Sequence, residues 1–410
     1  MRIRNKIPKI KRTVKEYEYF IILALLGIPI GVAVGAVDSV FGHGLVFVNK
    51  LRDAHPYWFI PFLAFVGLFI IWVRRRITKN DKFGINLVFA VGLGDATRIP
   101  LRLVPYVIVS TWLTHLFGGS SGREGVALQI GATISNRFGR KLPIKNVTEV
   151  FLITGLAAGF SGLFLTPITA ILFAIEVLIA GAIEYKALLP ALTASFSAAV
   201  TSGLLGLGKM SYSLNIQLPF NVINTIKIIV LGIIFGLVGG LFVYILRRVK
   251  MYLEKYIPNP YIRIFAVGII LSVVMILFHG RYCGVGSNLI EGVFNKDVIY
   301  SYDFILKLLL TVLTLSIGFQ GGEIMPLFAV GATLGYVIAP SFGLDPLFVS
   351  ALGMCSVFGS ATNTFFAPIF VGAEIFGFAA LPYFFVVCAI SYFCNLNKSV
   401  YSLQKINKND

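Results

Sequence analysis

The chain has 410 residues, of which 57% are hydrophobic and only 13% are charged, and its formal net charge is +17. Ordinary globular proteins carry about 25% charged residues, so this composition excludes a typical soluble protein and indicates a membrane protein. The positive charge does not indicate nucleic-acid binding, because Lys and Arg gather at the ends of apolar segments, as they do on the cytoplasmic flanks of membrane helices.

The N-terminal part of the chain is strongly basic. Residues 1–17 predict an amphipathic helix on the cytoplasmic surface, where anionic lipid would attract it. The basic region is too long for a cleavable signal peptide, and no small-residue cleavage site follows it. The positive charge predicts a multi-pass protein of the plasma (inner) membrane with both termini in the cytoplasm. The basic clusters are residues 2–15, 74–76, 137–145 and 247–255, with Lys405 and Lys408.

Several apolar stretches are long enough, or nearly so, to cross a bilayer of about 30 Å. Backbone that faces lipid must satisfy its own hydrogen bonds, so these stretches predict an all-α, polytopic protein. We divide the rest of the chain into a first membrane repeat (18–206), a linker (207–221), a second repeat (222–395) and a C-terminal segment (396–410). The clearest apolar stretches are Phe20–Val40, Trp58–Val73, Thr225–Leu246 and Ile262–Phe278.

Three segments of the first half return in the second half in the same order. In a membrane protein, duplicated halves with glycine-interrupted apolar segments at matching places indicate an ion site near the membrane midplane. The matching pairs are Phe83–Val88 with Val285–Ile290, Gly122–Thr133 with Gly322–Thr333, and Ala170–Glu176 with Pro368–Glu374.

Glycine-rich runs precede two matching helices, one at Gly118–Gly122 and one at Gly318–Gly322. Irregular backbone at membrane depth is tolerated only inside protein or beside water. A helix that begins there directs its free N–H groups and its positive dipole end at whatever lies in front. Two such helix starts, one from each half, predict an anion-binding site.

Charged side chains stand at these predicted helix starts. Glu124 could merely cap its own helix, but a carboxylate inside a membrane is costly and usually functional. We therefore interpret Glu124 as a group that competes with the anion, takes a proton and swings away, with Arg123 as its electrostatic support. Glu323 either shapes anion selectivity or proton transfer, or caps its helix. For Glu176 and Glu374 we expect structural pairing.

No residue pattern indicates an enzyme, a metal site or a cofactor. A membrane-embedded enzyme would need a nucleophile–base pair or a metal cluster, and no grouping of His, Cys and Asp supports one. Since no cysteine belongs to a Cys-x-x-Cys pair, we expect buried apolar thiols. The cysteines are Cys283, Cys355, Cys388 and Cys394, and the histidines, which show no metal-ligand spacing, are His43, His55, His115 and His279.

The chain resembles the CLC family of chloride channels and anion/proton exchangers. The resemblance rests on Gly122–Gly125 with the downstream Gln129–Gly131, on Gly322–Pro326, and on Lys398–Ser402 near the end. These motifs stand in the family's order and spacing and cover essentially the whole chain. Together they are highly specific, whereas Gly-Arg-Glu-Gly alone would not be.

The resemblance implies a homodimer in which each subunit consists of two inverted repeats and holds its own pathway, with the anion near the centre. Glu124 matches the gating glutamate of the family and Tyr401 its central tyrosine. The amides at Ile324 and Met325 match a helix start that faces the anion. The predicted anion-binding positions are Ile85, Arg123, Gly125, Ile324, Met325 and Tyr401.

Three departures from the common family pattern resemble its fluoride/proton-exchanging branch. Ile85 stands where chloride-transporting relatives have an anion-contacting serine, Glu323 precedes Ile324 in a Gly-Gly-Glu-x-x-Pro motif, and Val177 replaces an inner proton-transfer glutamate. That branch usually has Met or Asn at the serine position and commonly Thr at the position of Met325. A chloride/proton exchanger or a chloride channel of the same family is therefore the alternative to fluoride export driven by inward proton flow.

Overall fold

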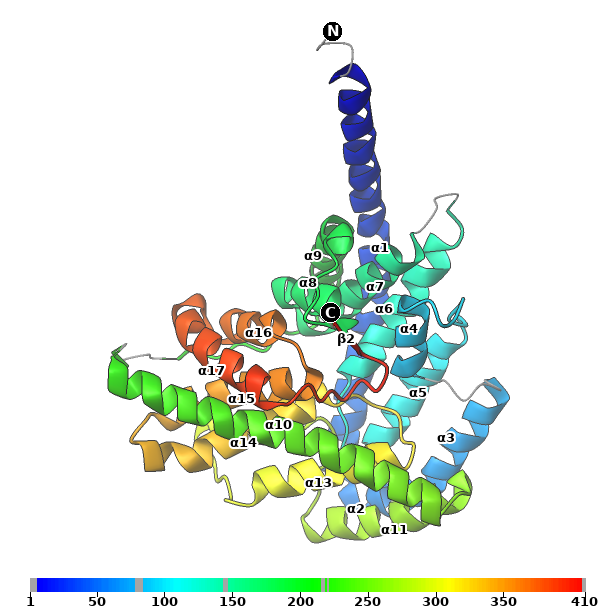
Figure 1. Ribbon diagram of the computed structural model, residues 1–410. Helices are drawn as coiled ribbons and strands as arrows, with labels where there is room; N and C mark the ends of the chain where they lie inside the picture. The colour runs from blue at the N-terminus through cyan, green and yellow to red at the C-terminus, as the bar shows by residue number, and fades with distance from the viewer. Residues whose placement is uncertain (1–5, 78–83, 143–146, 215–217, 220, 408–410) are drawn as a thin grey trace.

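The computed structural model describes residues 6–77, 84–142, 147–214, 218–219 and 221–407, with side chains from residue 18 onward. The described chain is almost entirely helical, as predicted (Figure 1). Parts of the predicted segments 1–17, 207–221 and 396–410, and Phe83 of the first matching segment, lie outside these residues. The first-half elements are α1 (Lys6–Ala54), α2 (Pro56–Phe59), η1 (Ile60–Phe62), α3 (Leu63–Ile77), α4 (Ile85–Gly92), α5 (Leu103–Leu116), α6 (Glu124–Gly139), α7 (Thr148–Phe164), α8 (Pro167–Glu176), β1 (Ile179–Ala180), η2 (Tyr185–Ala187) and α9 (Leu188–Leu204).

The second half repeats this order of short and long helices. Helices α12 to α17 follow one another as α4 to α9 do, and the sequence matches fall on the pairs α4/α12, α6/α14 and α8/α16. The second-half elements are α10 (Val222–Tyr256), α11 (Pro260–Leu277), α12 (Ser287–Asn295), α13 (Asp303–Ser316), α14 (Ile324–Phe342), α15 (Pro346–Thr362), α16 (Phe366–Phe376), η3 (Phe378–Ala380), α17 (Leu381–Cys394) and β2 (Lys405–Ile406).

One expectation about the first helices needs correction. Helix α1 runs without interruption from Lys6 to Ala54, so the predicted surface helix continues directly into the first long apolar helix. The stretch Trp58–Val73 lies, as expected, within a segment long enough to span, Pro56–Ile77, in which the 3₁₀ turn η1 with Pro61 joins α2 to α3. Figure 1 shows the N-terminal end of α1 extending away from the body of the molecule.

Many described helices are too short to cross a bilayer alone. Helices α8 and α16, for example, have 10 and 11 residues, which is about 15 Å of helix. Such broken helices are stable at membrane depth only when surrounded by protein, and both are mostly buried. Helical segments that are long and apolar enough to span are Glu18–Ala54, Pro56–Ile77, Tyr185–Leu204, Val222–Tyr256, Pro260–Leu277 and Ile324–Phe342.

Each half has the same close helix contact behind its glycine-rich start. Helices α6 and α7 meet at Gly131 and Gly155, and α14 and α15 meet at Gly331 and Gly353. A Cβ atom at any of these glycines would collide with the backbone of the facing helix. Small residues at helix contacts are expected in a membrane, where close packing replaces the hydrophobic effect between helices.

Reciprocal hydrogen bonds show that the two halves face each other as inverted repeats. The Glu176 carboxylate, at the end of α8, accepts from the first free N–H groups of α16, at Phe365 (3.1 Å), Phe366 (3.0 Å) and Ala367 (2.8 Å). The Glu374 carboxylate of α16 in turn accepts from the start of α8, including Thr169 N at 2.8 Å. Each glutamate thus caps a helix of the other repeat, which is the structural role predicted for both.

The C-terminal segment returns to the first repeat. Strand β2 pairs in parallel with β1, so that Lys405 and Ile406 lie opposite Ile179 and Ala180. In Figure 1, β2 is drawn close to α8 and α4. Tyr401 precedes β2 and is thereby carried into the interior.

Candidate functional site

Helices α6 and α14 begin opposite each other. Gly122 N donates to Gly322 O, and Gly322 N donates to Gly122 O at 2.8 Å, forming a small antiparallel bridge between the repeats. The free N–H groups of both first turns therefore converge on one region. This is the arrangement that the two glycine-rich runs predict.

Glu124 is the first residue of α6 and is fully buried. Its Oε2 accepts from Arg123 N at 3.0 Å. A Cβ at Gly322 would lie 2.9 Å from Oε2, so the carboxylate packs directly against the facing loop. Its Oε1 has no hydrogen-bond partner among the described residues. The carboxylate therefore lies between the two facing helix starts.

Arg123 supports this arrangement from the side. Its guanidinium lies over the Phe164 ring, 5.8 Å from the ring centre, and the side chain is half-buried. Its Nε finds no hydrogen-bond partner within the described chain. Arg123 thus places a positive charge beside Glu124, and its role as an electrostatic support stays a prediction.

Glu323 stands immediately before α14, in the N-cap position, but its side chain makes no capping hydrogen bond to the described backbone. This argues against the capping alternative. Its negative charge and that of Glu124 repel each other. A Cβ at Gly125 would lie 3.9 Å from the Glu323 Oε2 atom, so this carboxylate lies near the start of α6. The structure thus brings two carboxylates to two facing helix starts.

Tyr401 joins the site from the C-terminal segment. Its ring is 1% exposed, stacks on Phe89 of α4 with the ring centres 5.0 Å apart, and meets Phe173 of α8 edge-on at 6.3 Å. The hydroxyl has no hydrogen-bond partner in the described parts of the chain, and it interacts electrostatically with Glu323 and Glu124. A buried hydroxyl without a partner is rare and is available to a ligand.

The remaining predicted positions lie at the starts of α4, α6 and α14. Ile85 is the half-buried first residue of α4, and the neighbouring Asn86 Oδ1 accepts from Ser402 Oγ at 3.1 Å, which links the start of α4 to the Tyr401 segment. Ile324 and Met325 form the buried first turn of α14. Gly125 lies in the first turn of α6, close to the facing Gly322. Ile85 adds no hydrogen-bond donor from its side chain.

Val177 follows Glu176 at the end of α8 and is buried. Its carbonyl accepts from Gln404 Nε2 at 2.9 Å. An aliphatic side chain cannot take up a proton, so this position offers no inner proton acceptor. The nearby Glu176 carboxylate is already engaged by backbone amides of α16.

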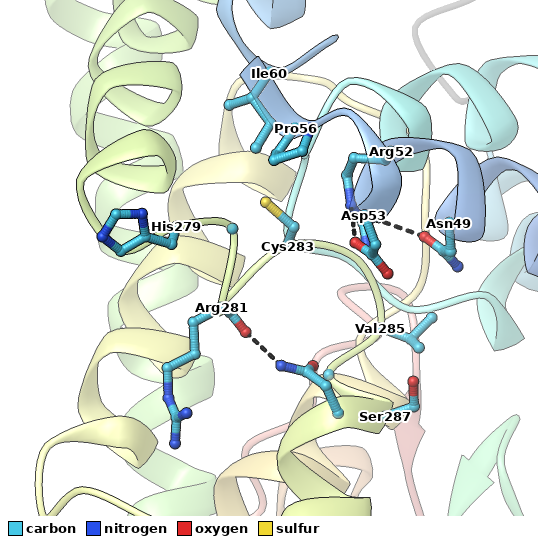
Figure 2. Close-up of a pocket in the computed structure, with 13 residues that line it drawn as sticks. Asn49, Arg52, Asp53, Pro56, Ile60, His279, Arg281, Cys283, Val285 and Ser287 are labelled. Atoms are coloured by element: carbon cyan, nitrogen blue, oxygen red, sulfur yellow. Dashed lines mark hydrogen bonds and ion pairs between the residues drawn. The ribbon is translucent and has the colours of Figure 1, made fainter. Parts of the chain in front are cut away.

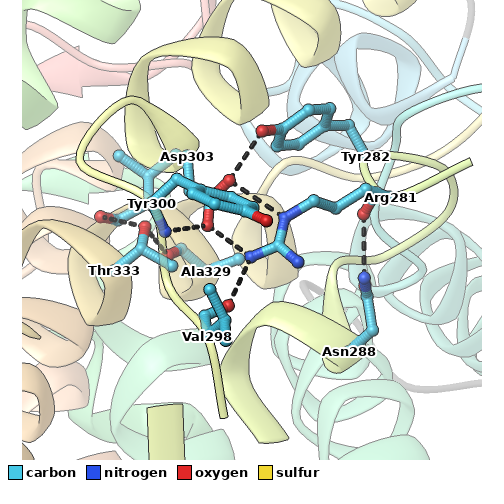
Figure 3. A network of polar contacts seen from close by, with 9 residues as sticks. Arg281, Tyr282, Asn288, Val298, Tyr300, Asp303, Ala329 and Thr333 are labelled. Atoms are coloured by element: carbon cyan, nitrogen blue, oxygen red, sulfur yellow. Dashed lines mark hydrogen bonds and ion pairs between the residues drawn. The ribbon is translucent and has the colours of Figure 1, made fainter. Parts of the chain in front are cut away.

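A charged cluster beside the site went unrecognised in the sequence. Asp303 is fully buried and accepts from Arg281 Nη2 (2.6 Å), Tyr282 Oη (2.6 Å) and Tyr300 N (2.9 Å), as Figure 3 shows. One helical turn later, the Lys307 ammonium is also fully buried. The signal that could have revealed Lys307 is a lysine within the apolar run of residues 304–313, since ionisable residues in membrane helices are usually functional.

A polar cavity of about 240 Å³ is lined in part by the loop that contains Cys283 and Val285 (Figure 2). Its lining includes Arg52 and Asp53, whose side chains pair at 2.7 Å. None of the predicted site residues lines it. Among the described residues, no group of three or more His, Cys, Asp or Glu side chains could hold a metal ion. Cys283, Cys355 and Cys388 are buried free thiols, as predicted, and Cys394 is half-buried.

Comparisons with known proteins agree with this geometry. Residues 66–396 match the family described as voltage gated chloride channel. A chloride/fluoride channel protein of Pseudomonas syringae pv. tomato is 30% identical over 392 residues, which cover 94% of this chain and 86% of that protein. An H(+)/Cl(-) exchange transporter, ClcA, of Yersinia pseudotuberculosis is 25% identical over 389 residues, which cover 84% of this chain and 78% of the relative.

Two solved structures show the same fold. The crystal structure of a CLC-type fluoride/proton antiporter matches with a TM-score of 0.93 and 48% identity, over 95% of this chain and 99% of that chain. The structure of a slow cyanobacterial Cl−/H+ antiporter matches with a TM-score of 0.79 over 93% of this chain and 96% of that chain. The second likeness, at 17% identity, concerns the fold alone.

Proposed function

We propose that this chain, which belongs to the voltage gated chloride channel family, is an antiporter that exports fluoride in exchange for protons. One observation carries the proposal: the fully buried Glu124 carboxylate lies between the starts of α6 and α14, where an anion would bind. An ionised carboxylate competes with an anion for these amides, whereas a protonated one has lost the charge that holds it there. Anion binding and protonation of one group thus become linked.

The choice of fluoride rests on the surrounding donors. Fluoride is small and strongly hydrated, so a site must replace much of its water with hydrogen bonds. The amides at the starts of α6 and α14 and the unpaired Tyr401 hydroxyl can supply them. Ile85 offers no side-chain hydroxyl, and Glu323 adds negative charge for which a chloride site has little use. The 48% identity to a structure described as a CLC-type fluoride/proton antiporter supports the same choice.

A chloride/proton exchanger is the second candidate. Met325 stands where the fluoride-exchanging branch commonly has threonine, and the Yersinia relative is named as an H(+)/Cl(-) exchange transporter. Both candidates share the role of Glu124 and differ only in the preferred anion.

Protons reach the cytoplasm, in this proposal, through Glu124 alone or together with Glu323, because Val177 cannot carry one. The proposed assembly is a homodimer with one pathway in each subunit and with both termini in the cytoplasm. Exposed apolar side chains on α9 and α17 support a protein or lipid contact on these helices. They include Leu189, Phe196, Val200, Phe385 and Phe393.

Ion efflux from liposomes that contain the purified protein tests the proposal. Fluoride and chloride are measured side by side with ion-selective electrodes, together with the proton movement that each anion gradient drives. We expect fluoride to leave at least as fast as chloride and to drive protons inward. Rapid, proton-coupled chloride transport with negligible fluoride movement would reject fluoride and leave the chloride exchanger.

A further inference from the structure

One face of α13 carries a stripe of buried polar side chains. They recur every three or four residues, which places them on the same side of the helix. The stripe consists of Asp303, Lys307, Thr311 and Thr314. All four side chains are fully buried, although the helix is otherwise mainly apolar.

Lys307 is the central member of the stripe. Its ammonium donates to Ser120 Oγ at 2.9 Å, to Tyr282 O at 3.1 Å and to Gly284 O at 2.7 Å. These three bonds use its whole donor capacity. No ion-pair partner for it occurs in the described part of the chain. Burying an unpaired cation in a membrane protein is costly, so a structural or functional gain must offset that cost.

The contacts of Lys307 join two loops that lead into different helices. Ser120 belongs to the glycine-rich run before α6, and Tyr282 and Gly284 belong to the loop before α12. The same two loops also bond directly, because Gly284 N donates to Gly119 O at 2.9 Å. The α12 loop also forms part of the wall of the cavity in Figure 2.

Other members of the stripe hold the same loops. Ser120 Oγ shares a hydrogen bond of 2.9 Å with Thr311 Oγ1, and Ser120 N donates to Thr314 Oγ1 at 3.2 Å. At the other end, Asp303 binds Arg281 and Tyr282 (Figure 3). A helix of the second repeat therefore fixes a loop of the first repeat only four positions before Glu124.

The matching helix of the first repeat carries no charged side chain at these two positions. In α5, the helix that matches α13, Leu103 and Val107 stand at the positions of Asp303 and Lys307. Within the described residues, the loop before α14 therefore has no lysine from α5 equivalent to the one that holds the loop before α6. This lysine clamp acts on the helix start that carries the proposed gate.

We infer that Lys307 is a positioning residue for the exchange reaction: it fixes the Ser120–Gly122 loop so that the Glu124 carboxylate returns to the same amides after each excursion. The inference rests on the proposed function. Charge-assisted hydrogen bonds are stronger than neutral ones, which suits a loop that must stay in place while the adjoining side chain moves. When the loop loosens, anion and carboxylate no longer exclude each other, and anions cross without protons.

Removing the clamp in two places tests this inference. In Lys307→Met we expect the number of protons moved per anion to fall, and proton-coupled turnover to slow by about tenfold or more, since small misplacements of reacting groups have such effects. Ser120→Ala removes the Ser120 Oγ bonds to Lys307 and Thr311, leaves Lys307 bonded to the α12 loop, and should lower the proton-to-anion ratio less. Because both changes break the Lys307–Ser120 contact, the effect of the double variant should be smaller than the sum of the two single effects. Lys296→Met, at an exposed lysine after α12, is the matched control.

The proton-to-anion ratio distinguishes a positioning role of Lys307 from a purely structural one. A residue that only stabilised the fold would lower protein yield and leave this ratio unchanged. The ratio is measured with whichever anion the wild type moves together with protons. An unchanged ratio in Lys307→Met, or in Ser120→Ala if the first variant does not fold, overturns this inference and leaves the proposed function intact. A wild type that moves neither anion with protons overturns the proposed function, and this inference with it.

Discussion

The starts of α6 and α14 occupy equivalent places in the two repeats but present different side chains. In α6, Arg123 precedes the helix and Glu124 is its first residue, whereas in α14 Glu323 precedes the helix and Ile324 is its first residue. The backbones match so closely that Gly122 and Gly322 bond to each other. The duplicated backbone thus supplies two similar sets of free amides. The side chains make them different, because α6 has a carboxylate, Glu124, in its first turn and α14 has none.

The two helix starts therefore have different proposed roles. The α6 start carries the group proposed to compete with the anion, and it alone is held by Lys307. The α14 start carries Glu323, whose side chain leaves its own helix uncapped among the described contacts and lies near Gly125 across the bridge. Substitutions that make the two helix starts more alike therefore test the proposal most directly.

Glu124→Gln removes the distinctive group of the α6 start and should have the largest effect. The neutral amide cannot carry a proton, so we expect proton coupling to be abolished. External acid should accelerate fluoride export in the wild type, because inward proton flow drives it, and should leave the variant unaffected. Fluoride-driven proton uptake into liposomes is the measurement. Intact proton pumping in this variant would refute the role of Glu124.

Glu323→Gln removes the negative charge of the α14 start. We expect fluoride turnover, or the preference for fluoride over chloride, to change by about fivefold or more, because one charge near a small anion changes its interaction energy by at least about 1 kcal/mol. Paired fluoride and chloride efflux measures both quantities. Wild-type turnover, selectivity and coupling in this variant would show that Glu323 takes no part in transport.

Ile85→Ser sharpens the comparison by adding a hydroxyl at a third helix start, that of α4. We expect the relative rates to shift towards chloride by about fivefold, the effect of one hydrogen bond worth about 1 kcal/mol. Ile85→Val, which adds no donor, is the control for altered packing. An equal shift in both variants would mean that packing, not the hydroxyl, sets the preference.

Val177→Ala should have the smallest effect. The position contributes no titratable group, so the proton-to-anion ratio should equal that of the wild type in the same liposome assay. A loss of coupling here, together with unchanged coupling in Glu323→Gln, would overturn the proposed proton route through Glu124 and Glu323.

The sequence was sufficient to predict the helical membrane fold, the duplication and the facing glycine-rich helix starts. These features depend on local composition and on matches such as Gly122 with Gly322, which are visible without coordinates. The 3₁₀ turn at Pro61 has no counterpart in the prediction, because the apolar run around it is continuous. The presence of Lys307 in an apolar run was visible, but its partners were not, since Ser120 lies 187 positions away.

The Tyr401 site shows the same limit. The motif Lys398–Ser402 suggested the residue, but its position beside Phe89 and Phe173 depends on a segment that returns to pair with Ile179 and Ala180. Such contacts between distant segments carry no local sequence pattern. They follow from the packing of the two repeats against each other.

The reciprocal caps at Glu176 and Glu374 have a consequence for biosynthesis. The ribosome completes α8 long before it reaches Phe366, so the Glu176 carboxylate and the first amides of α8 must wait in the membrane without their final partners. We therefore expect the first repeat to fold poorly on its own. Until the second repeat has been synthesised, it should be recognised by chaperones or by quality-control factors. Two half-chains expressed separately should accumulate only when both are made in the same cell.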